Sequence, residues 1–299
     1  MKNTLSYYLI LSLFFICGGN LHAVAQQDGV ALNLKVLLQG AMMHLLPGDT
    51  LMRDDLRAKG YLPLVEPYSN LTHFEHVGND GGGETVAGAP VFEVEGPDAI
   101  VDWVFIELRD QVALDSVIAT RSALLQRDGD VVDVDGVSAL FFPSVSAGAY
   151  DVAVRHRNHL GAMTEDALDL SFVPVFFDFT SPNYDIYGAD IYVQIAMNGK
   201  RALWGGDLNH DGRILFQGPG NDVFPLFTQI LYAASNNLLI LNYVAAGYFE
   251  SDVDLDGFTI YMGPGNDKQK FFTEIYGKIL SICPTCPDGD NYIFIEALP

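Results

Sequence analysis

The chain contains the stretch Asp207-Leu-Asn-His-Asp-Gly-Arg-Ile-Leu-Phe-Gln-Gly-Pro-Gly-Asn-Asp222 and repeats it 45 residues later as Asp252-Val-Asp-Leu-Asp-Gly-Phe-Thr-Ile-Tyr-Met-Gly-Pro-Gly-Asn-Asp267. Eight of the 16 aligned positions are identical, whereas unrelated segments would share about one. Each copy runs into a segment that is compatible with a helix, at residues 223–234 and 268–281, and an Asn-Tyr pair follows in both. We therefore interpret residues 204–299 as a duplicated loop–helix unit.

Both copies begin with the pattern D-x-[DN]-x-D-G, which sets three oxygen side chains at alternate positions before a glycine that permits a sharp bend. These side chains are Asp207, Asn209 and Asp211 in the first copy and Asp252, Asp254 and Asp256 in the second. Carboxylates gathered in this way repel one another without a cation. Because ligands that are all oxygen favour Ca²⁺ over zinc or copper, the spacing predicts two Ca²⁺ sites.

The repeats resemble dockerin type I and EF-hand-like calcium repeats, in particular the duplicated modules at the C-terminal end of large secreted proteins of Bacteroidetes-type bacteria. Residues 97–164 resemble the same group through the stretches Asp-Ala-Ile-Val-Asp-Trp-Val and Arg-His-Arg-Asn-His-Leu-Gly. That group is described mostly as calcium-binding, haemagglutinin-like or uncharacterised, so the resemblance implies lineage more than activity. The EF-hand ligand set also includes position 7, which is Arg213 in the first copy and Phe258 in the second.

The repeats depart from a standard EF-hand loop at its end. Such a loop closes with a bidentate carboxylate at position 12, where this chain has Gly218 and Gly263. The Gly-Pro-Gly-Asn-Asp insertion instead brings Asp222 and Asp267 to position 16. Two interpretations stay open at this point: the late aspartate returns to the ion, or the Asn-Asp pair caps the helix that follows.

Composition and the N-terminus indicate an exported protein. Acidic residues outnumber basic ones 38 to 16 in 299 residues, for a formal net charge of -22, which excludes a generic nucleic-acid binder. Lys2, an apolar run at residues 5–17 and the small residues of Ala-Val-Ala at 23–25 predict a signal peptide over residues 1–25. The run is too short to span a bilayer, and we expect no membrane span elsewhere. We therefore expect a secreted or cell-surface location.

The two cysteines outside this leader are Cys283 and Cys286, in the sequence Cys-Pro-Thr-Cys. Prolines and an Asp-Gly-Asp stretch around them favour a loop, whereas a redox dithiol needs a helix that begins after the first cysteine. A local disulfide suits an oxidising compartment best, with two free thiols or a catalytic dithiol as the alternatives.

The remainder of the chain has the pattern of a mainly β protein. Strand-like runs lie at residues 30–38, 91–95, 100–109, 116–126, 130–134, 138–142, 149–156 and 167–173. Turn residues separate them at short intervals, which predicts an antiparallel β-sandwich over residues 91–175 with Trp103, Val104 and Ile106 in its core. We expect residues 26–90 to add a strand and loops to this sandwich, with a short helix near 50–60, and residues 176–203 to be a connector or edge strands.

Two further groups of polar residues have a functional and a structural interpretation. His156 and His159 have metal-binding or acid–base chemistry, but strand alternation places them on opposite faces unless a turn intervenes, so a structural role is favoured. Four aspartates at 128, 130, 133 and 135 resemble another calcium cluster. Two of them precede glycines in ordinary hairpin-turn pairs, which favours turns.

No motif of nucleophilic, zinc-protease or phosphate-binding chemistry occurs in the chain. The sequence thus predicts a non-catalytic, calcium-binding protein that acts in adhesion or extracellular assembly, with another extracellular protein or a glycan as its partner. The alternative is an extracellular polysaccharide-acting hydrolase or accessory protein with a dockerin-like appendage. A deep cleft with two carboxylates about 5–9.5 Å apart would favour that alternative.

Overall fold

The structure is a computed structural model that describes residues 28–46, 48–78, 81–188, 194–282 and 294–299. The predicted signal peptide, Cys283 and Cys286 lie outside the described residues.

Most of the regular structure is β. The strands are β1 (Gly29–Lys35), β2 (Ile100–Asp110), β3 (Val117–Gln126), β4 (Asp130–Val132), β5 (Leu140–Pro143), β6 (Gly148–His156), β7 (His159–Met163), β8 (Leu168–Leu170), β9 (Val175–Asp178), β10 (Gln194–Met197), β11 (Lys200–Leu203), β12 (Arg213–Ile214), β13 (Val244–Ala246), β14 (Phe258–Ile260) and β15 (Phe294–Ile295). The helices are α1 (Gln39–Met42), α2 (Asp55–Ala58), η1 (Tyr68–Asn70), η2 (Ala89–Glu93), α4 (Val223–Leu231), α5 (Asp267–Lys270), η3 (Phe271–Tyr276) and α6 (Gly277–Ile282).

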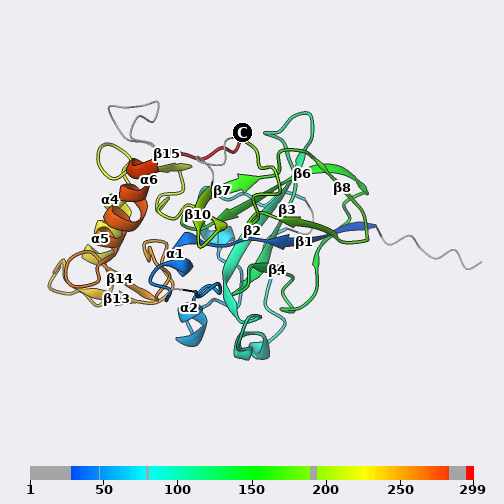
Figure 1. Cartoon of the computed structure of the whole chain (residues 1–299). Helices are drawn as coiled ribbons and strands as arrows, with labels where there is room; N and C mark the ends of the chain where they lie inside the picture. Colours follow the sequence, from blue (N-terminus) through cyan, green and yellow to red (C-terminus); the bar gives the residue numbers. More distant parts are fainter. Residues whose placement is uncertain (1–27, 47, 79–80, 189–193, 283–293) are drawn as a thin grey trace, which may run out of the picture.

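Within the described part of the chain, nine strands form one sheet. Its main path runs β5-β1-β4-β3-β2-β6-β7, with β8 also paired to β6 and β9 to β1. All pairs are antiparallel except the parallel pair β1–β9. The structure therefore shows an antiparallel β fold, but it does not show the two stacked sheets of a sandwich (Figure 1).

The centre of the sheet is β2 with its neighbour β3. The sequence of β2, Ile-Val-Asp-Trp-Val-Phe-Ile-Glu-Leu-Arg-Asp, is rich in the β-branched and aromatic residues that pack well on a pleated surface. All but the last of its residues are buried. Trp103, Val104 and Ile106 are fully buried, which confirms their predicted place in the core.

Three sequence predictions for the β region were wrong or incomplete. Residues 91–95 are not a strand, because the helix η2 covers most of them and Pro90 at its first turn has no backbone donor for a strand ladder. Strand β7 was not predicted, since all five of its residues are buried and no alternation marks them. The run at 167–173 shortens to β8. The expected short helix near residues 50–60 is α2, which is only four residues long.

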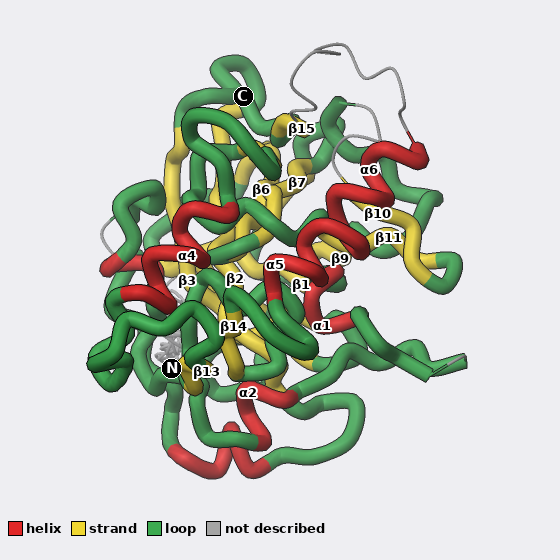
Figure 2. The backbone as a smooth tube through the Cα atoms, turned by 90° about the vertical axis from the view of Figure 1, so that its left-hand side faces the viewer, coloured by secondary structure: helices red, strands yellow, loops and turns green. Residues whose placement is uncertain are grey.

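The C-terminal third packs directly on the sheet. Helix α4 follows the first acidic loop, and α5, η3 and α6 follow the second as consecutive helical segments. These helices lie to one side of the sheet in Figure 1, and Figure 2 views them from that side, with α4 and α5 in front of the strands. Leu226 and Ile275 from these helices belong to the same hydrophobic cluster as Trp103 of β2. No helix in the described ranges is long and apolar enough to cross a membrane.

Candidate metal centre

The first aspartate of each acidic loop fixes the bend of that loop. Asp207 accepts the backbone N–H groups of Asp211 and Gly212, both at 3.1 Å. Asp252 accepts those of Asp256 and Gly257, at 3.1 and 2.7 Å. Gly212 and Gly257 have φ values of 74° and 82°, the left-handed conformation that favours glycine. The D-x-[DN]-x-D-G pattern therefore folds in the same way in both copies.

The late aspartates clamp the loops rather than cap the helices. Asp222 is fully buried, and its two oxygens accept the backbone N–H groups of Leu208 at 2.8 Å and Leu215 at 2.7 Å. Asp267 is bound in the same way by Val253 and Ile260, at 3.1 and 2.8 Å.

The asparagine before each late aspartate is the residue that caps. Asn221 accepts the backbone N–H of Phe224 at 3.0 Å, and Asn266 accepts that of Gln269 at 2.8 Å. The capping interpretation is therefore correct for the asparagines. It does not describe the aspartates, and each of their oxygens keeps a lone pair beyond its backbone hydrogen bond.

The second loop gathers its three predicted ligands. Asp252, Asp254 and Asp256 each offer an oxygen, and these oxygens lie within 4.8 Å of one another. Asp252 and Asp254 are buried and Asp256 is partly buried. Burial, with Asp267 and Asp254 as neighbouring charges, raises the pKa of Asp252 well above its ordinary value. Three carboxylates this close need a positive charge among them.

A lysine of the same chain supplies one positive charge to the second loop. The ammonium group of Lys270, in α5, lies 2.7 Å from Asp254 Oδ1, 3.4 Å from Asp256 Oδ2 and 3.7 Å from Asp267 Oδ1. The residue is only 8% exposed. Burial would lower the pKa of Lys270, but the carboxylates of Asp267 and Asp254 raise it above its ordinary value. A cation therefore already lies among the predicted ligands.

The first loop has the same acidic character without such a lysine. The position that corresponds to Lys270 is Pro225. Among the described residues, no lysine or arginine forms an ion pair with Asp207, Asp211 or Asp222. Burial, followed by the nearby carboxylates Glu296 and Asp211, raises the pKa of Asp207 to about 8.

Burial, with Asp207 as its neighbour, also raises the pKa of Asp222 well above its ordinary value. The remaining predicted ligand of the first loop, Asn209, is tied to the loop by its side chain, which accepts from Asp211 N and donates to Gly220 O. The first loop thus holds several carboxylates, and no lysine or arginine in the described part of the chain forms an ion pair with them.

The donor set of both loops fits Ca²⁺. Their side chains offer oxygen only, as a hard cation prefers. In the second loop the Lys270 ammonium is a stand-in for a cation. In the first loop, among the described residues, no lysine or arginine forms an ion pair with Asp207, Asp211 or Asp222. Arg213 and Phe258 at position 7 have no side-chain oxygen, so the oxygen that this position can offer is its backbone carbonyl.

In each repeat, the strand that follows the helix pairs with the loop strand of the other repeat. Strand β12 of the first loop pairs with β15, which follows the second helix, and β14 of the second loop pairs with β13, which follows the first helix. The aromatic contacts cross in the same manner, with Phe216 against Phe272 at 4.9 Å and Tyr261 against Phe227 at 5.4 Å between ring centroids. A change at one loop therefore acts on the strand and helix of the other.

The turn between β6 and β7 joins the loops to the sheet. Asn158 donates its side-chain N–H groups to Glu250 O at 2.9 Å and Asp252 O at 2.8 Å. Its backbone carbonyl accepts Gly206 N at 2.9 Å, immediately before the first loop. Both loops are thus anchored on one hairpin turn.

A buried ion pair lies behind this turn. Arg157 and Asp102 of β2 form it at 3.0 Å, and Tyr248 donates its hydroxyl to Asp102 Oδ1 at 2.6 Å. Burial alone would raise the pKa of Asp102, but the Arg157 guanidinium holds it well below its usual range. Removing either charge would leave the other buried without a partner.

The two histidines of this turn have structural roles, as favoured from the sequence. The turn places them on the same side, with His156 Nδ1 2.9 Å from His159 Nδ1. Gly40 N donates to His159 Nε2 at 3.0 Å, so the proton of the neutral His159 is on Nδ1. His156 Nε2 donates to Asp102 at 3.2 Å. Burial lowers the pKa of both histidines, and both side chains are engaged in hydrogen bonds.

The aspartates between 128 and 135 serve turns and surface ion pairs. Asp128 and Asp130 pair with Lys35, and Asp133 pairs with Arg121 at 3.0 Å. Asp135 accepts two backbone N–H groups of its own turn. The preference for turns over a further calcium cluster agrees with this geometry.

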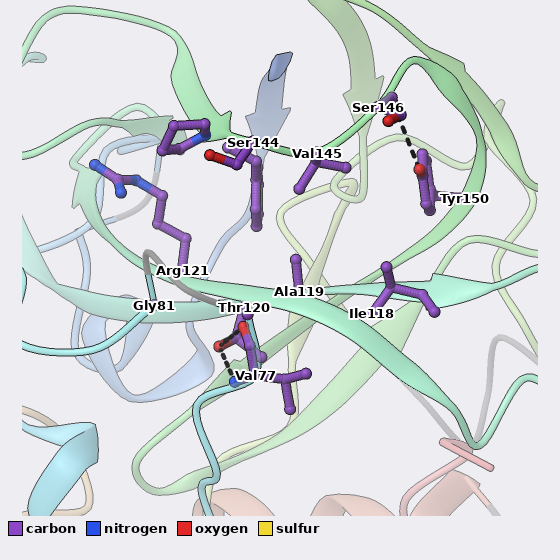
Figure 3. Close-up of a pocket in the computed structure, with 13 residues that line it drawn as sticks. Val77, Gly81, Ile118, Ala119, Thr120, Arg121, Ser144, Val145, Ser146 and Tyr150 are labelled. Atoms are coloured by element: carbon purple, nitrogen blue, oxygen red, sulfur yellow. Dashed lines mark hydrogen bonds between the residues drawn. The ribbon is translucent and has the colours of Figure 1, made fainter. Parts of the chain in front are cut away.

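Four cavities in the described part of the chain lack an acid–base pair of carboxylates. Each of these four is lined by at most one carboxylate. One of about 310 Å³ lies beside β3, where Val77 N donates to Thr120 Oγ1, and its lining has neither histidine nor carboxylate (Figure 3). Its Arg121 is held by Asp133. None of the four has the carboxylate pair that a glycosidase requires.

Comparison of the chain with protein-family models, curated proteins and solved structures finds no match. The acidic loops are therefore the feature of the chain that indicates function.

Sequence reasoning did not identify Lys270, Glu296 or Asp102 as part of this region. The sequence does contain a signal for Lys270, because the first repeat has proline at the same position. A lysine in only one copy indicates that the two loops differ in charge balance. The sequence also has a signal for Asp102, because a charge among the apolar residues 99–106 must find a buried partner. Glu296 had none, since it lies far along the chain from the loop it approaches.

Proposed function

We propose that the chain is a secreted or cell-surface calcium-binding protein without catalytic activity, and that each acidic loop binds one Ca²⁺ ion. The observation that carries the proposal is the convergence of oxygens from Asp252, Asp254 and Asp256 within 4.8 Å of one another, with the Lys270 ammonium paired to Asp254 and Asp256, which favours a site built for positive charge. The first loop has the same internal hydrogen bonds, and its excess of carboxylates lacks a balancing lysine.

The proposed ligands follow from the shared geometry of the loops. They are Asp207, Asn209, Asp211 and the carbonyl of Arg213 in one loop, and Asp252, Asp254, Asp256 and the carbonyl of Phe258 in the other. Asp222 and Asp267 are proposed to add a late oxygen while they keep their backbone hydrogen bonds. Because Ca²⁺ takes six to eight oxygens at about 2.3–2.6 Å, water would complete each site.

The ion would stabilise the contact between the loops and the sheet. It would neutralise buried carboxylates that otherwise hold protons or a lysine, and it would bind the folded loop far better than the unfolded chain. At 100 times the dissociation constant, one such site adds about 2.7 kcal/mol to the free energy of unfolding. The finer architecture of a β-sandwich with a duplicated EF-hand-like module is part of this proposal, and the matched hydrogen bonds of the two loops support the duplication.

The adhesive part of the proposal concerns a groove between the two repeats. Phe216, Tyr261 and Phe272 line it together with the polar side chains of Lys268 and Gln269, in a cavity of about 450 Å³. Aromatic faces beside amide and ammonium donors suit a sugar ring. The net charge of -22 repels acidic polymers, so a neutral glycan is the partner that we propose. Loss of neutral-glycan binding in Phe272→Ala would support this, and binding only to proteins would contradict it.

A polysaccharide hydrolase is the weaker alternative, since none of the four cavities has a pair of carboxylates. The proposed calcium function is tested by calorimetric titration of the whole chain with Ca²⁺. Two sites are expected, and Asp211→Ala and Asp256→Ala should each remove one of them. Asp98→Ala, which changes an exposed aspartate outside the loops, is the matched control. Titrations in which the two loop variants bind as much calcium as the wild type would contradict the proposal.

A further inference from the structure

A second cluster of metal-ligating side chains lies far from the acidic loops. Glu66, His76 and Glu84 come from the irregular segment that precedes β2, and one ligand atom of each lies within 4.8 Å of the others. Glu66 is 1% exposed, Glu84 is 8% exposed, and the His76 side chain is 12% exposed. Among the described residues no lysine or arginine forms an ion pair with either glutamate. Among the described residues, these two buried carboxylates are therefore grouped with one histidine, a metal-binding side chain, and with no lysine or arginine.

Both carboxylates are held in place by backbone groups. Glu66 accepts the backbone N–H groups of Gly83 and Ser69, both at 3.0 Å. Glu84 accepts that of Ser122 in β3 at 3.1 Å. The segments that carry the two glutamates are also paired with each other, since Glu66 N donates to Glu84 O at 2.9 Å. Ligands that are oriented by such outer hydrogen bonds are typical of built metal sites.

The histidine turns one nitrogen to the protein and the other to the carboxylates. His76 Nδ1 lies 3.3 Å from Thr120 Oγ1, which orients the ring, and the ring packs edge-on against Phe105 at 5.0 Å. His76 Nε2 is buried and has no hydrogen-bond partner in the described part of the chain. An unpaired buried nitrogen beside the buried carboxylate of Glu66 is costly unless a cation lies between them.

The distance between these groups distinguishes a metal from a simple hydrogen bond. His76 Nε2 lies 3.6 Å from Glu66 Oε2, which is too long for a hydrogen bond between these atoms. Two ligands of one tetrahedral zinc ion, each bound at about 2.0–2.1 Å, are about 3.4 Å apart. The spacing is thus close to that of two ligands on a shared ion.

We propose that Glu66, His76 and Glu84 bind a divalent transition-metal ion, with Zn²⁺ as the best fit. One imidazole nitrogen and two carboxylates suit zinc, whereas the all-oxygen loops suit calcium. The neutral histidine binds through Nε2, and its Nδ1–H donates to Thr120, the arrangement common among metal-bound histidines. Three protein ligands leave a fourth position for water. Thr120, which orients the His76 ring, also lines the cavity of about 310 Å³ in Figure 3.

The test is zinc binding by the whole chain without a histidine tag, in an excess of Ca²⁺ that occupies the acidic loops. One Zn²⁺ per chain is expected by elemental analysis, and Co²⁺ in its place should give visible absorption bands from an ion with a histidine nitrogen ligand. His76→Gln and Glu84→Gln should each weaken zinc binding by more than the 10- to 100-fold that outer-shell changes typically cause. This site does not depend on the proposed calcium function, and either can fail alone.

Two matched controls lie in the same segment, since His73 and Glu75 are exposed. His73→Gln and Glu75→Gln should bind zinc as the wild type does. Near-ultraviolet circular dichroism checks that each variant is folded, and the wild-type stoichiometry is informative by itself. Wild-type protein without zinc, or a folded His76→Gln variant that retains it at the same affinity, would overturn the proposal.

Discussion

Replacing Lys270 by methionine should make the second loop depend on calcium. Methionine keeps most of the length of the side chain and removes the ammonium that lies 2.7 Å from Asp254 and 3.4 Å from Asp256. Without calcium, the variant leaves these carboxylates and Asp267 in a buried cluster with less compensation. With calcium, the ion takes the place of the lost charge.

The size of the effect follows from the burial of this group. Lys270 is only 8% exposed, and loss of one partner from a buried ion pair costs about 3–5 kcal/mol. For a chain of this size that corresponds to a fall in melting temperature of about 10 °C in chelator. Because Ca²⁺ no longer displaces an ammonium, its affinity at the second loop should rise by about 100-fold, the equivalent of about 3 kcal/mol.

Thermal unfolding in EGTA and in saturating Ca²⁺, together with calcium calorimetry, measures both effects. Lys268→Met is the matched control, since Lys268 lies two residues away and contacts Tyr261 rather than the aspartates. The control should leave both the melting temperature and the calcium affinity close to those of the wild type. A Lys270→Met variant that loses equal stability in calcium and in chelator, with unchanged calcium affinity, would refute the reasoning.

Three further predictions concern single carboxylates. Asp222→Ala should lower the free energy of unfolding by about 1–3 kcal/mol for each orphaned amide in chelator, and by more in calcium, because a proposed ligand is lost as well. Asn221→Ala should cost only about 1 kcal/mol in either condition, and urea unfolding measures both. In chelator, stability should fall as pH rises from about 4 to about 8, because folding raises the pKa of Asp207 to about 8 and the folded chain keeps a proton that the unfolded chain has released. Urea midpoints in EGTA that do not fall between pH 5 and pH 8 would contradict this. Asp102→Asn should cost about 3–5 kcal/mol, since Arg157 keeps its buried charge without a partner, and a loss below about 1 kcal/mol in urea unfolding would show the pair to be unimportant.

Local patterns in the sequence predicted the parts of the fold that depend on neighbouring residues. The apolar and aromatic run of β2 predicted a strand with core residues, and the spacing of Asp252 and Asp256 before a glycine predicted the bend of the loop. These features could be predicted because the interactions that form them span only a few residues.

The other parts of the fold and of the candidate sites depend on contacts between residues that are distant in the chain. No local sequence pattern indicates such contacts. Tyr248 reaches Asp102 across 146 positions in the chain. The pairing of β15 with β12 brings Glu296 to the first loop, and nothing near Glu296 in the sequence indicates it. His76 likewise becomes a candidate metal ligand only when the fold places Glu66 and Glu84 beside it.

The most direct test of the calcium proposal combines bound metal with stability in one sample. Calcium per chain is measured by elemental analysis after gel filtration in calcium-free buffer, and the melting temperature is then recorded with and without EGTA. The proposal predicts calcium bound at up to two ions per chain and a clear fall in melting temperature in EGTA, of several degrees for each site that is lost. Protein that holds no calcium, and whose melting temperature is the same in EGTA and in saturating calcium, would contradict it.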